Sequence, residues 1–146
     1  MVDQRLNSQH LDQMVRLISE GFPSSQWSKD GLEKLLNLET CVAWGAFHED
    51  ILVGFILIQK VLDESEILLI VVHLCHRRKG VARLLMEKIF SYLKHEQIQR
   101  IFLEVSVENE PALSFYRNFD FEITGIRKNY YSHKTNKSAH IMQKNI

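Results

Sequence analysis

The sequence predicts a mixed α/β (α+β) domain in which about four helices flank a central mixed sheet of six to seven strands. Four segments repeat apolar residues at helical spacing, and six others form apolar or alternating runs of strand length. In the middle of the chain the order is strand, helix, strand, which is typical of two parallel strands joined by a right-handed crossover. The chain has 146 residues, 45% hydrophobic and 25% charged, as expected for one globular domain over residues 1–146.

Two helices are expected first. Residues 8–20 place apolar side chains at helical spacing, and Ser8 is suited to the N-cap. The stretch "GFPSSQWS" interrupts this helix. Ser28 then starts a second short helix, whose apolar residues are Leu32, Leu35 and Leu36.

The rest of the chain predicts six strands and two more helices. The uninterrupted apolar run at residues 66–72 suits a central strand covered on both faces. The other strands are expected at residues 41–47, 51–61, 101–107, 121–128 and 138–145, with "HED" as a hairpin turn between the first two. The helices are expected at residues 80–94 and 109–119, the first with a face formed by Val81, Leu84, Leu85, Ile89 and Tyr92. Ligands of strand–helix–strand units bind at the C-terminal ends of the strands.

Composition narrows the class of protein. The 18 basic and 18 acidic residues give zero net charge, so no direct nucleic-acid binding is expected. The two cysteines make no disulfide framework, which fits a reducing cytosol. The N-terminus lacks the apolar core of a signal peptide, and the longest apolar run, "ILLIVV", is too short to span a bilayer. We therefore expect a cytoplasmic protein without a membrane partner.

Positive charge is concentrated at the start of the third helix, in the stretch "HRRKGVA". A helix N-terminus offers free N–H groups and partial positive charge, and Gly80 lets an anion approach the backbone. The residues alone equally allow a solvated basic loop. The stretch is neither a P-loop nor a dinucleotide fingerprint, because the required lysine and glycine spacings are missing.

The pattern R-x-x-G-x-A after an apolar strand resembles the acetyl-CoA pyrophosphate loop of the GNAT superfamily of N-acetyltransferases. The resemblance implies acetyl-CoA as cosubstrate and no metal. It implies that the loop backbone holds the pyrophosphate and that the preceding strand pairs with the pantetheine arm. The implied cofactor-binding residues are Ile70, Val71, Val72, Arg77, Arg78, Lys79, Gly80, Val81, Ala82 and Asn109.

Within this superfamily, "VLDESEILLIVV", "LEVSVEN", "ALSFY" and "IRKNYY" resemble RimI-type ribosomal-protein alanine N-acetyltransferases, over residues 22–141. The resemblance implies acetylation of the N-terminal alanine of ribosomal protein S18, by a monomer or weak dimer. Acceptors left open are another protein N-terminus, a lysine side chain or a small amine. A CoA-binding module without catalysis is a further alternative. The chain departs from the family at His73 and Leu74, where aspartate and proline are usual, and at Asp120, where glycine is usual.

The resemblance also implies catalytic roles. Glu104 matches the general base and Tyr116 the general acid that protonates the thiolate. From the residues alone, the favoured interpretation of Glu104 is an outward carboxylate on a half-exposed strand, and that of Tyr116 is a core side chain packing its helix. Asn109 matches a cofactor contact but is also a natural N-cap.

Two further features carry weaker predictions. Tyr130 and Tyr131 match the region that lines the peptide entrance, and are alternatively exposed hairpin aromatics. His73 and His76 have no second ligand pair at suitable spacing, so no metal site is expected. Cys75 has no evident His–Asp partner and is not expected to be a nucleophile.

Overall fold

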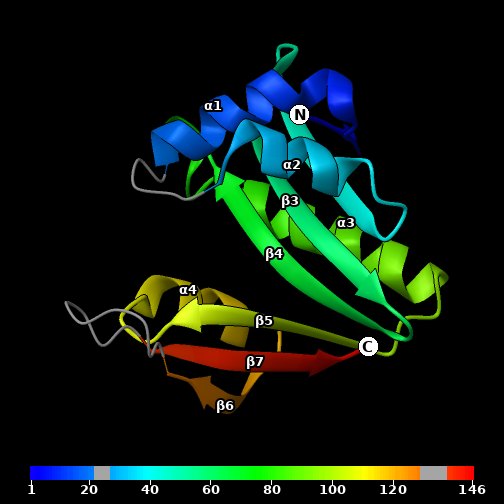
Figure 1. The fold of residues 1–146 in the computed structure, drawn as a ribbon. Helices are drawn as coiled ribbons and strands as arrows, with labels where there is room; N and C mark the ends of the chain where they lie inside the picture. Colours follow the sequence, from blue (N-terminus) through cyan, green and yellow to red (C-terminus); the bar gives the residue numbers. More distant parts are fainter. Residues whose placement is uncertain (22–26, 129–137) are drawn as a thin grey trace.

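A computed structural model describes residues 1–21, 27–128 and 138–146. Seven strands form one sheet in the order β1-β2-β3-β4-β5-β7-β6 (Figure 1). The strands are β1 Val2–Arg5, β2 Cys41–His48, β3 Ile51–Val61, β4 Glu64–Val72, β5 Arg100–Ser106, β6 Glu122–Arg127 and β7 Ala139–Asn145. The helices are α1 Leu11–Gly21, α2 Lys29–Leu36, α3 Val81–His95 and α4 Glu110–Arg117, with 3₁₀ turns η1 Ser8–His10 and η2 Leu74–His76.

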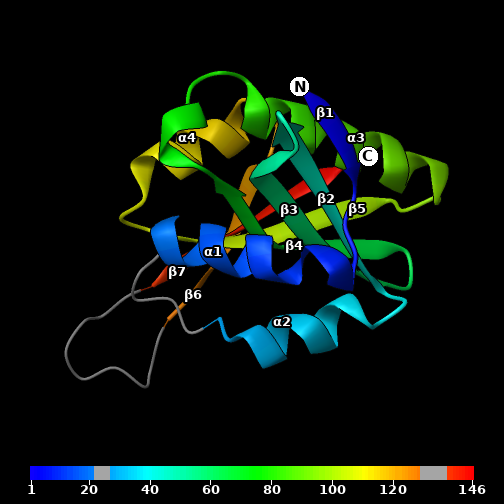
Figure 2. The same ribbon diagram turned by 90° about the horizontal axis from the view of Figure 1, so that it is seen from above.

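The helices form two layers around the sheet. Figures 1 and 2 show α1 and α2 on one face, and α3 and α4 on the other. Each face has its own apolar core: Phe55, Leu57 and Val71 face α1 and α2, whereas Ile67 and Leu103 face α3 and α4. In the described part of the chain, no helix is long and apolar enough to cross a membrane.

The predicted mixed sheet and its central parallel pair are confirmed. β4 and β5 run parallel and are joined through α3, while the other neighbouring strands pair antiparallel. The predicted hairpin turn is confirmed at Glu49 and Asp50, both of which have positive φ.

Three details of the prediction were wrong. Residues 2–5 form the edge strand β1, for which no strand was predicted. The first helix is capped by Asn7 and not by Ser8: the Asn7 side chain accepts from the Gln9 N–H at 2.9 Å, and a 3₁₀ turn precedes α1. The buried face of α3 also includes Met86 and Leu93, which the prediction omitted; the predicted Leu84 and Tyr92 do pack against this core, partly buried.

A bulge in β4 changes the direction of its side chains. Leu57 of β3 pairs with Leu69, and the next residue, Ile58, pairs with Ile67, so Leu68 is the extra residue. Residues four apart in a regular strand share a face. Here Ile67 and Val71 enter opposite cores, so β4 contributes to both faces.

Candidate active site

The parallel strands separate in the middle of the sheet. β4 and β5 pair from Glu64–Arg100 to Ile67–Leu103, and no further. Both strands continue, β4 to Val72 and β5 to Ser106, and Figure 1 shows them diverging. Glu104 is the first residue of β5 beyond the last pair, so its position coincides with the separation.

The second half of β4 carries the residues predicted to meet pantetheine. Ile70, Val71 and Val72 pair with β3 on one side. On the other side they lie beyond the last pair with β5. Backbone groups along that edge therefore suit an extended ligand that pairs like a strand.

The predicted pyrophosphate loop joins η2 to α3. Gly80 is the N-cap of α3 with φ of 82°, and α3 has no side-chain cap. A Cβ added at Gly80 would meet nothing within 4 Å, so the space in front of the helix is open. Arg77, Arg78 and Lys79 are exposed around it. Free N–H groups, the helix dipole and three cations together fit a diphosphate.

Two contacts hold this loop to the sheet. The Arg77 Nε–H donates to the Val72 carbonyl at 3.2 Å. The Val81 side chain is buried in the core on the α3 face, while Ala82 is half-buried behind it. The start of α3 is thereby fixed next to the C-terminal end of β4.

Three histidine rings lie beside the loop. The His76 ring is 5.9 Å from that of His73 and 5.5 Å from that of His48, which the sequence analysis had not connected with it. Burial, then the positive charge of Lys79 and the neighbouring histidines, lowers the pKa of His76. Across the described ranges, no group of three or more His, Cys, Asp or Glu residues is arranged to hold a metal. Cys75 is an exposed free thiol.

Where the family usually has aspartate and proline, this chain forms the 3₁₀ turn η2. The His73 Nδ1 accepts a hydrogen bond from the Cys75 N–H at 3.1 Å and so caps the turn. The His73 Nε2 also lies 3.4 Å from the Glu20 carboxylate on α1. The contact between His73 and Glu20 therefore lies next to the predicted pyrophosphate loop.

Glu104 is accessible and ion-paired. Its side chain is 35% exposed, and Arg127 of β6 donates to both carboxylate oxygens, at 3.1 and 3.2 Å. β7 separates the two strands, so Arg127 reaches across it to Glu104. Arg127 lies in the segment "IRKNYY", and no local sequence pattern indicates this contact.

Glu66 is a second carboxylate at the same place. It is half-buried on β4, one residue before the last pair with β5. Burial, then the charge of Glu104, raises the pKa of Glu66, and Arg127 acts in the opposite direction. From the sequence, Glu66 is only the first residue of a predicted strand. The predicted parallel pairing was the available signal, because it makes the two strands neighbours.

Tyr116 lies on α4 and is 7% exposed. It packs edge-on against Phe121, with ring centroids 5.6 Å apart. Burial raises the pKa of Tyr116 to about 12, so the hydroxyl keeps its proton at neutral pH. Asn109 is the N-cap of α4, and its Oδ1 accepts from the Ala112 N–H at 3.2 Å.

The end of α4 is held against α3. The Arg83 guanidinium, in the first turn of α3, lies 5.0 Å from the Phe119 ring centre. Asp120 follows in the left-handed conformation, with φ of 68°, which aspartate tolerates better than most residues. Arg83 and Phe119 therefore bring α4 beside the predicted pyrophosphate loop. Tyr130 and Tyr131 lie outside the described residues.

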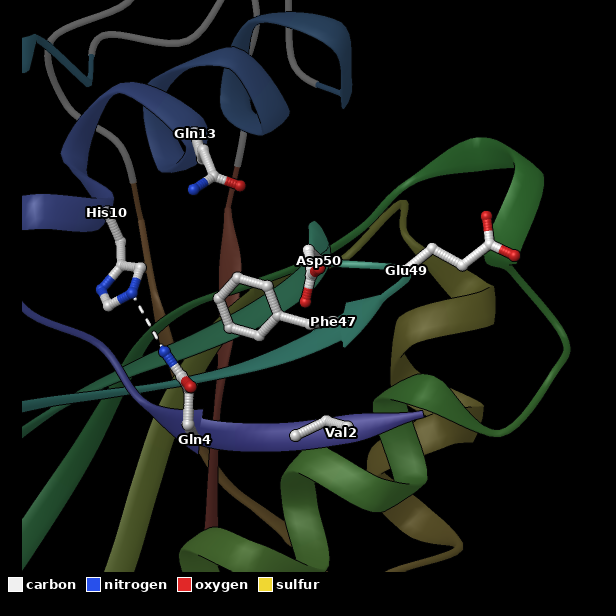
Figure 3. Close-up of a pocket in the computed structure, with 7 residues that line it drawn as sticks. All are labelled: Val2, Gln4, His10, Gln13, Phe47, Glu49 and Asp50. Atoms are coloured by element: carbon white, nitrogen blue, oxygen red, sulfur yellow. Dashed lines mark hydrogen bonds between the residues drawn. The ribbon is translucent and has the colours of Figure 1, made fainter.

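A pocket of about 420 Å³ lies elsewhere, between β1, the start of α1 and the β2–β3 turn. Figure 3 shows His10 and Phe47 on one side of it and Glu49 at its rim. None of the predicted catalytic or cofactor residues lines this pocket. We therefore do not connect it with the site at the end of β4.

Comparison with known proteins identifies the family of this chain. Residues 11–121 match the model of the acetyltransferase (GNAT) family. The probable N-acetyltransferase san of Drosophila melanogaster is 29% identical over 142 residues, which cover 94% of this chain and 76% of the fly protein. The ribosomal protein bS18-alanine N-acetyltransferase of Salmonella typhimurium is 31% identical over 99 residues, covering 68% of this chain and 63% of that protein.

A solved structure has the same fold. The ribosomal-protein-S18-alanine N-acetyltransferase from Escherichia coli superposes with a TM-score of 0.91 at 24% identity, covering 99% of this chain and 93% of the other. The family match covers most of this chain, from the first helix to the end of α4. The chain therefore belongs to the GNAT family of acetyltransferases.

Proposed function

We propose that this protein transfers the acetyl group of acetyl-CoA to the N-terminal α-amine of a protein, with the alanine of ribosomal protein S18 as the first acceptor to test. The observation that carries the proposal is the position of Glu104, an accessible carboxylate where the parallel strands separate. The Salmonella relative, which is named for this acceptor, supports the choice of S18.

Acetyl-CoA would supply an acetyl group activated as a thioester. The backbone of residues 77–82 would hold its pyrophosphate at the open N-terminus of α3, and residues 70–72 would pair with its pantetheine arm. Asn109, at the start of α4, is a further contact in the proposal. The cofactor would thus lie along the edge of β4 beyond its pairing with β5.

Two side chains would handle protons. The acceptor ammonium has a pKa near 8 and must lose a proton before it attacks, so Glu104 would accept that proton through a water molecule. Tyr116 would donate its proton to the departing sulfur. The pKa of Tyr116, raised to about 12 by burial, keeps the hydroxyl protonated at neutral pH, so the proton is present although the group is a weaker acid than an ordinary tyrosine. Tyr130 and Tyr131 remain proposed acceptor contacts.

The proposal is tested by measuring thiol release from acetyl-CoA with three acceptors. These are a peptide copying the S18 N-terminus, the same peptide with its α-amine blocked and a lysine free, and a small primary amine. We expect release with the first peptide alone. Release with the lysine peptide or the small amine alone would instead assign a different acceptor to the same fold.

A further inference from the structure

We propose that the diphosphate of acetyl-CoA binds together with a proton that His76 takes from solvent, so that the affinity for the cofactor rises as the pH falls. This inference rests on the proposed cofactor site at the start of α3. It adds a titrating side chain to that site and assigns a role to the histidines beside the loop.

His76 lies where three elements meet. It is the last residue of η2, and Gly80, four residues later, is the N-cap of α3. Its ring centre is 5.9 Å from that of His73, the N-cap of η2. It is 5.5 Å from the ring centre of His48, the last residue of β2. The ends of β2 and η2 and the open start of α3 therefore come together at the His76 imidazole.

The three rings differ in their partners. The His73 Nε2 lies 3.4 Å from the Glu20 carboxylate. The His48 Nε2 lies 3.9 Å from the Glu49 carboxylate. The His76 Nδ1 is covered from solvent, and among the described residues it has no hydrogen-bond partner. Glu20 and Glu49 thus face the two outer rings, and no carboxylate of the described residues lies within ion-pair distance of His76.

The charges closest to His76 in the chain are positive. Arg77, Arg78 and Lys79 follow it directly and are exposed. Burial, then the charge of Lys79 and of the neighbouring histidines, lowers the pKa of His76. The His76 ring is therefore neutral at neutral pH in the free protein, because nothing nearby compensates a positive charge on it.

A bound diphosphate reverses this balance. The proposed site places its negative charge at the N-terminus of α3, beside the same cations that oppose a charge on His76. The negative charge favours the protonated imidazole, and it also neutralises part of the repulsion from the loop. We therefore expect the pKa of His76 to rise on binding, and the ring then forms a new N–H bond with a proton from solvent.

The direction of the pH dependence follows from proton linkage. Above the pKa of His76 in the complex, neither form of the protein holds the proton, so the affinity is constant. Between that pKa and the lower pKa of the free protein, only the complex holds the proton, so a fall in pH strengthens binding. A rise of about one unit in the pKa on binding corresponds to about tenfold in affinity across this range.

Calorimetry with 3′-dephospho-CoA tests the proton uptake directly. This probe keeps the diphosphate and lacks the phosphate monoester, which titrates in the same pH range. Titrations in buffers of different ionisation enthalpy give the number of protons bound with each ligand. We expect net proton uptake, and an affinity about tenfold higher at about pH 5.5 than at about pH 8. No uptake and a constant affinity, in a protein that binds the probe, would refute the proposal and leave the cofactor site intact.

Two variants locate the proton. His76→Gln removes the titrating ring, so we expect it to bind the probe with little proton uptake and with an affinity that depends little on pH. His95→Gln is the matched control, because His95 is exposed at the opposite end of α3. It should take up as many protons as the wild type. Equal uptake in His76→Gln and the wild type would assign the proton to another group and overturn the proposal.

A further measurement needs no variant. Imidazole NMR titration of the wild type follows His76 with and without 3′-dephospho-CoA, and we expect its midpoint at higher pH in the complex. An unchanged midpoint would overturn the proposal. A shifted midpoint in a protein that acetylates none of the three acceptors would support the proposal and contradict the proposed function. A protein that binds neither CoA nor 3′-dephospho-CoA would contradict both.

Discussion

Glu104 combines two properties that a general base needs, access to the acceptor and a defined orientation. Access follows from its position just beyond the last pair between β4 and β5. Orientation follows from Arg127, which contacts both carboxylate oxygens. Both hydrogen bonds come from one guanidinium nitrogen, Nη1, and such charge-assisted bonds are stronger than neutral ones.

Replacing Glu104 should separate catalysis from binding. Glu104→Gln keeps the shape of the side chain but cannot accept a proton, so we expect kcat to fall by roughly 10²–10⁴-fold. Acetyl-CoA affinity, measured by calorimetry, should stay the same because the proposed cofactor residues are untouched. Glu108→Gln, which removes an exposed carboxylate after β5, is the control. Turnover like that of the wild type would remove Glu104 from the mechanism.

The sequence predicted some of these residues and missed others for a physical reason. Glu104 and Tyr116 lie in short motifs that resemble a known family, so each was found by its local context. Glu66 and Arg127 come close to Glu104 only through strand register, which joins β4, β5, β7 and β6. Their partners are far apart in the chain, and no local pattern records the pairing.

Among the elements, η2 and the start of α3 form the proposed pyrophosphate loop. The left-handed backbone at Gly80 begins α3 without a side-chain cap. Arg78, two residues earlier, also has positive φ, 60°. The sequence predicted the helix start at Gly80, because a glycine before an amphipathic segment is a local signal. It did not predict β1, because the segment "VDQR" is short and its side chains are mostly exposed.

Two substitutions at Gly80 should distinguish backbone strain from obstruction of the proposed pyrophosphate site. Gly80→Ala keeps free space around its Cβ but places an L-residue at φ of 82°, so we expect a loss of about 1 kcal/mol in unfolding free energy. Gly80→Asn tolerates that conformation better, yet its larger side chain projects into the anion space. We therefore expect Gly80→Asn to lose less unfolding free energy than Gly80→Ala, as measured by chemical denaturation. We expect it to lose more acetyl-CoA affinity than Gly80→Ala, as measured by calorimetry. Equal acetyl-CoA affinity in both variants and the wild type would place the pyrophosphate elsewhere.

At the scale of the whole molecule, the sheet is one layer with two separate cores. α1 and α2 cover the first core, and α3 and α4 cover the second. The bulge at Leu68 lets β4 contribute to both, at the level where it parts from β5. The sequence indicated a strand covered on both faces, but a bulge depends on pairing with β3 and could not be read from β4 alone.

Because Tyr116 is buried, the unfolding free energy of the whole protein should decrease at alkaline pH. Its pKa is about 12 in the folded protein against an ordinary value of 10.0. Between these values the unfolded chain loses the proton and the folded one keeps it, so stability is full below about pH 10 and falls above it. Between about pH 8 and about pH 11, the wild type should lose about 1 kcal/mol more unfolding free energy than Tyr116→Phe. Equal losses of unfolding free energy, measured by urea unfolding, would mean that Tyr116 ionises as readily in the folded protein as in the unfolded chain.

The central claim is acetyl transfer to an α-amine, with Glu104 as the base. The most direct measurement is tandem mass spectrometry of the S18 N-terminal peptide carrying an internal lysine, after incubation with acetyl-CoA and either the wild type or Glu104→Gln. The account predicts one acetyl group on the α-amine with the wild type and almost none with the variant. Acetyl groups on the lysine, or no product from a wild type that binds acetyl-CoA, would contradict it.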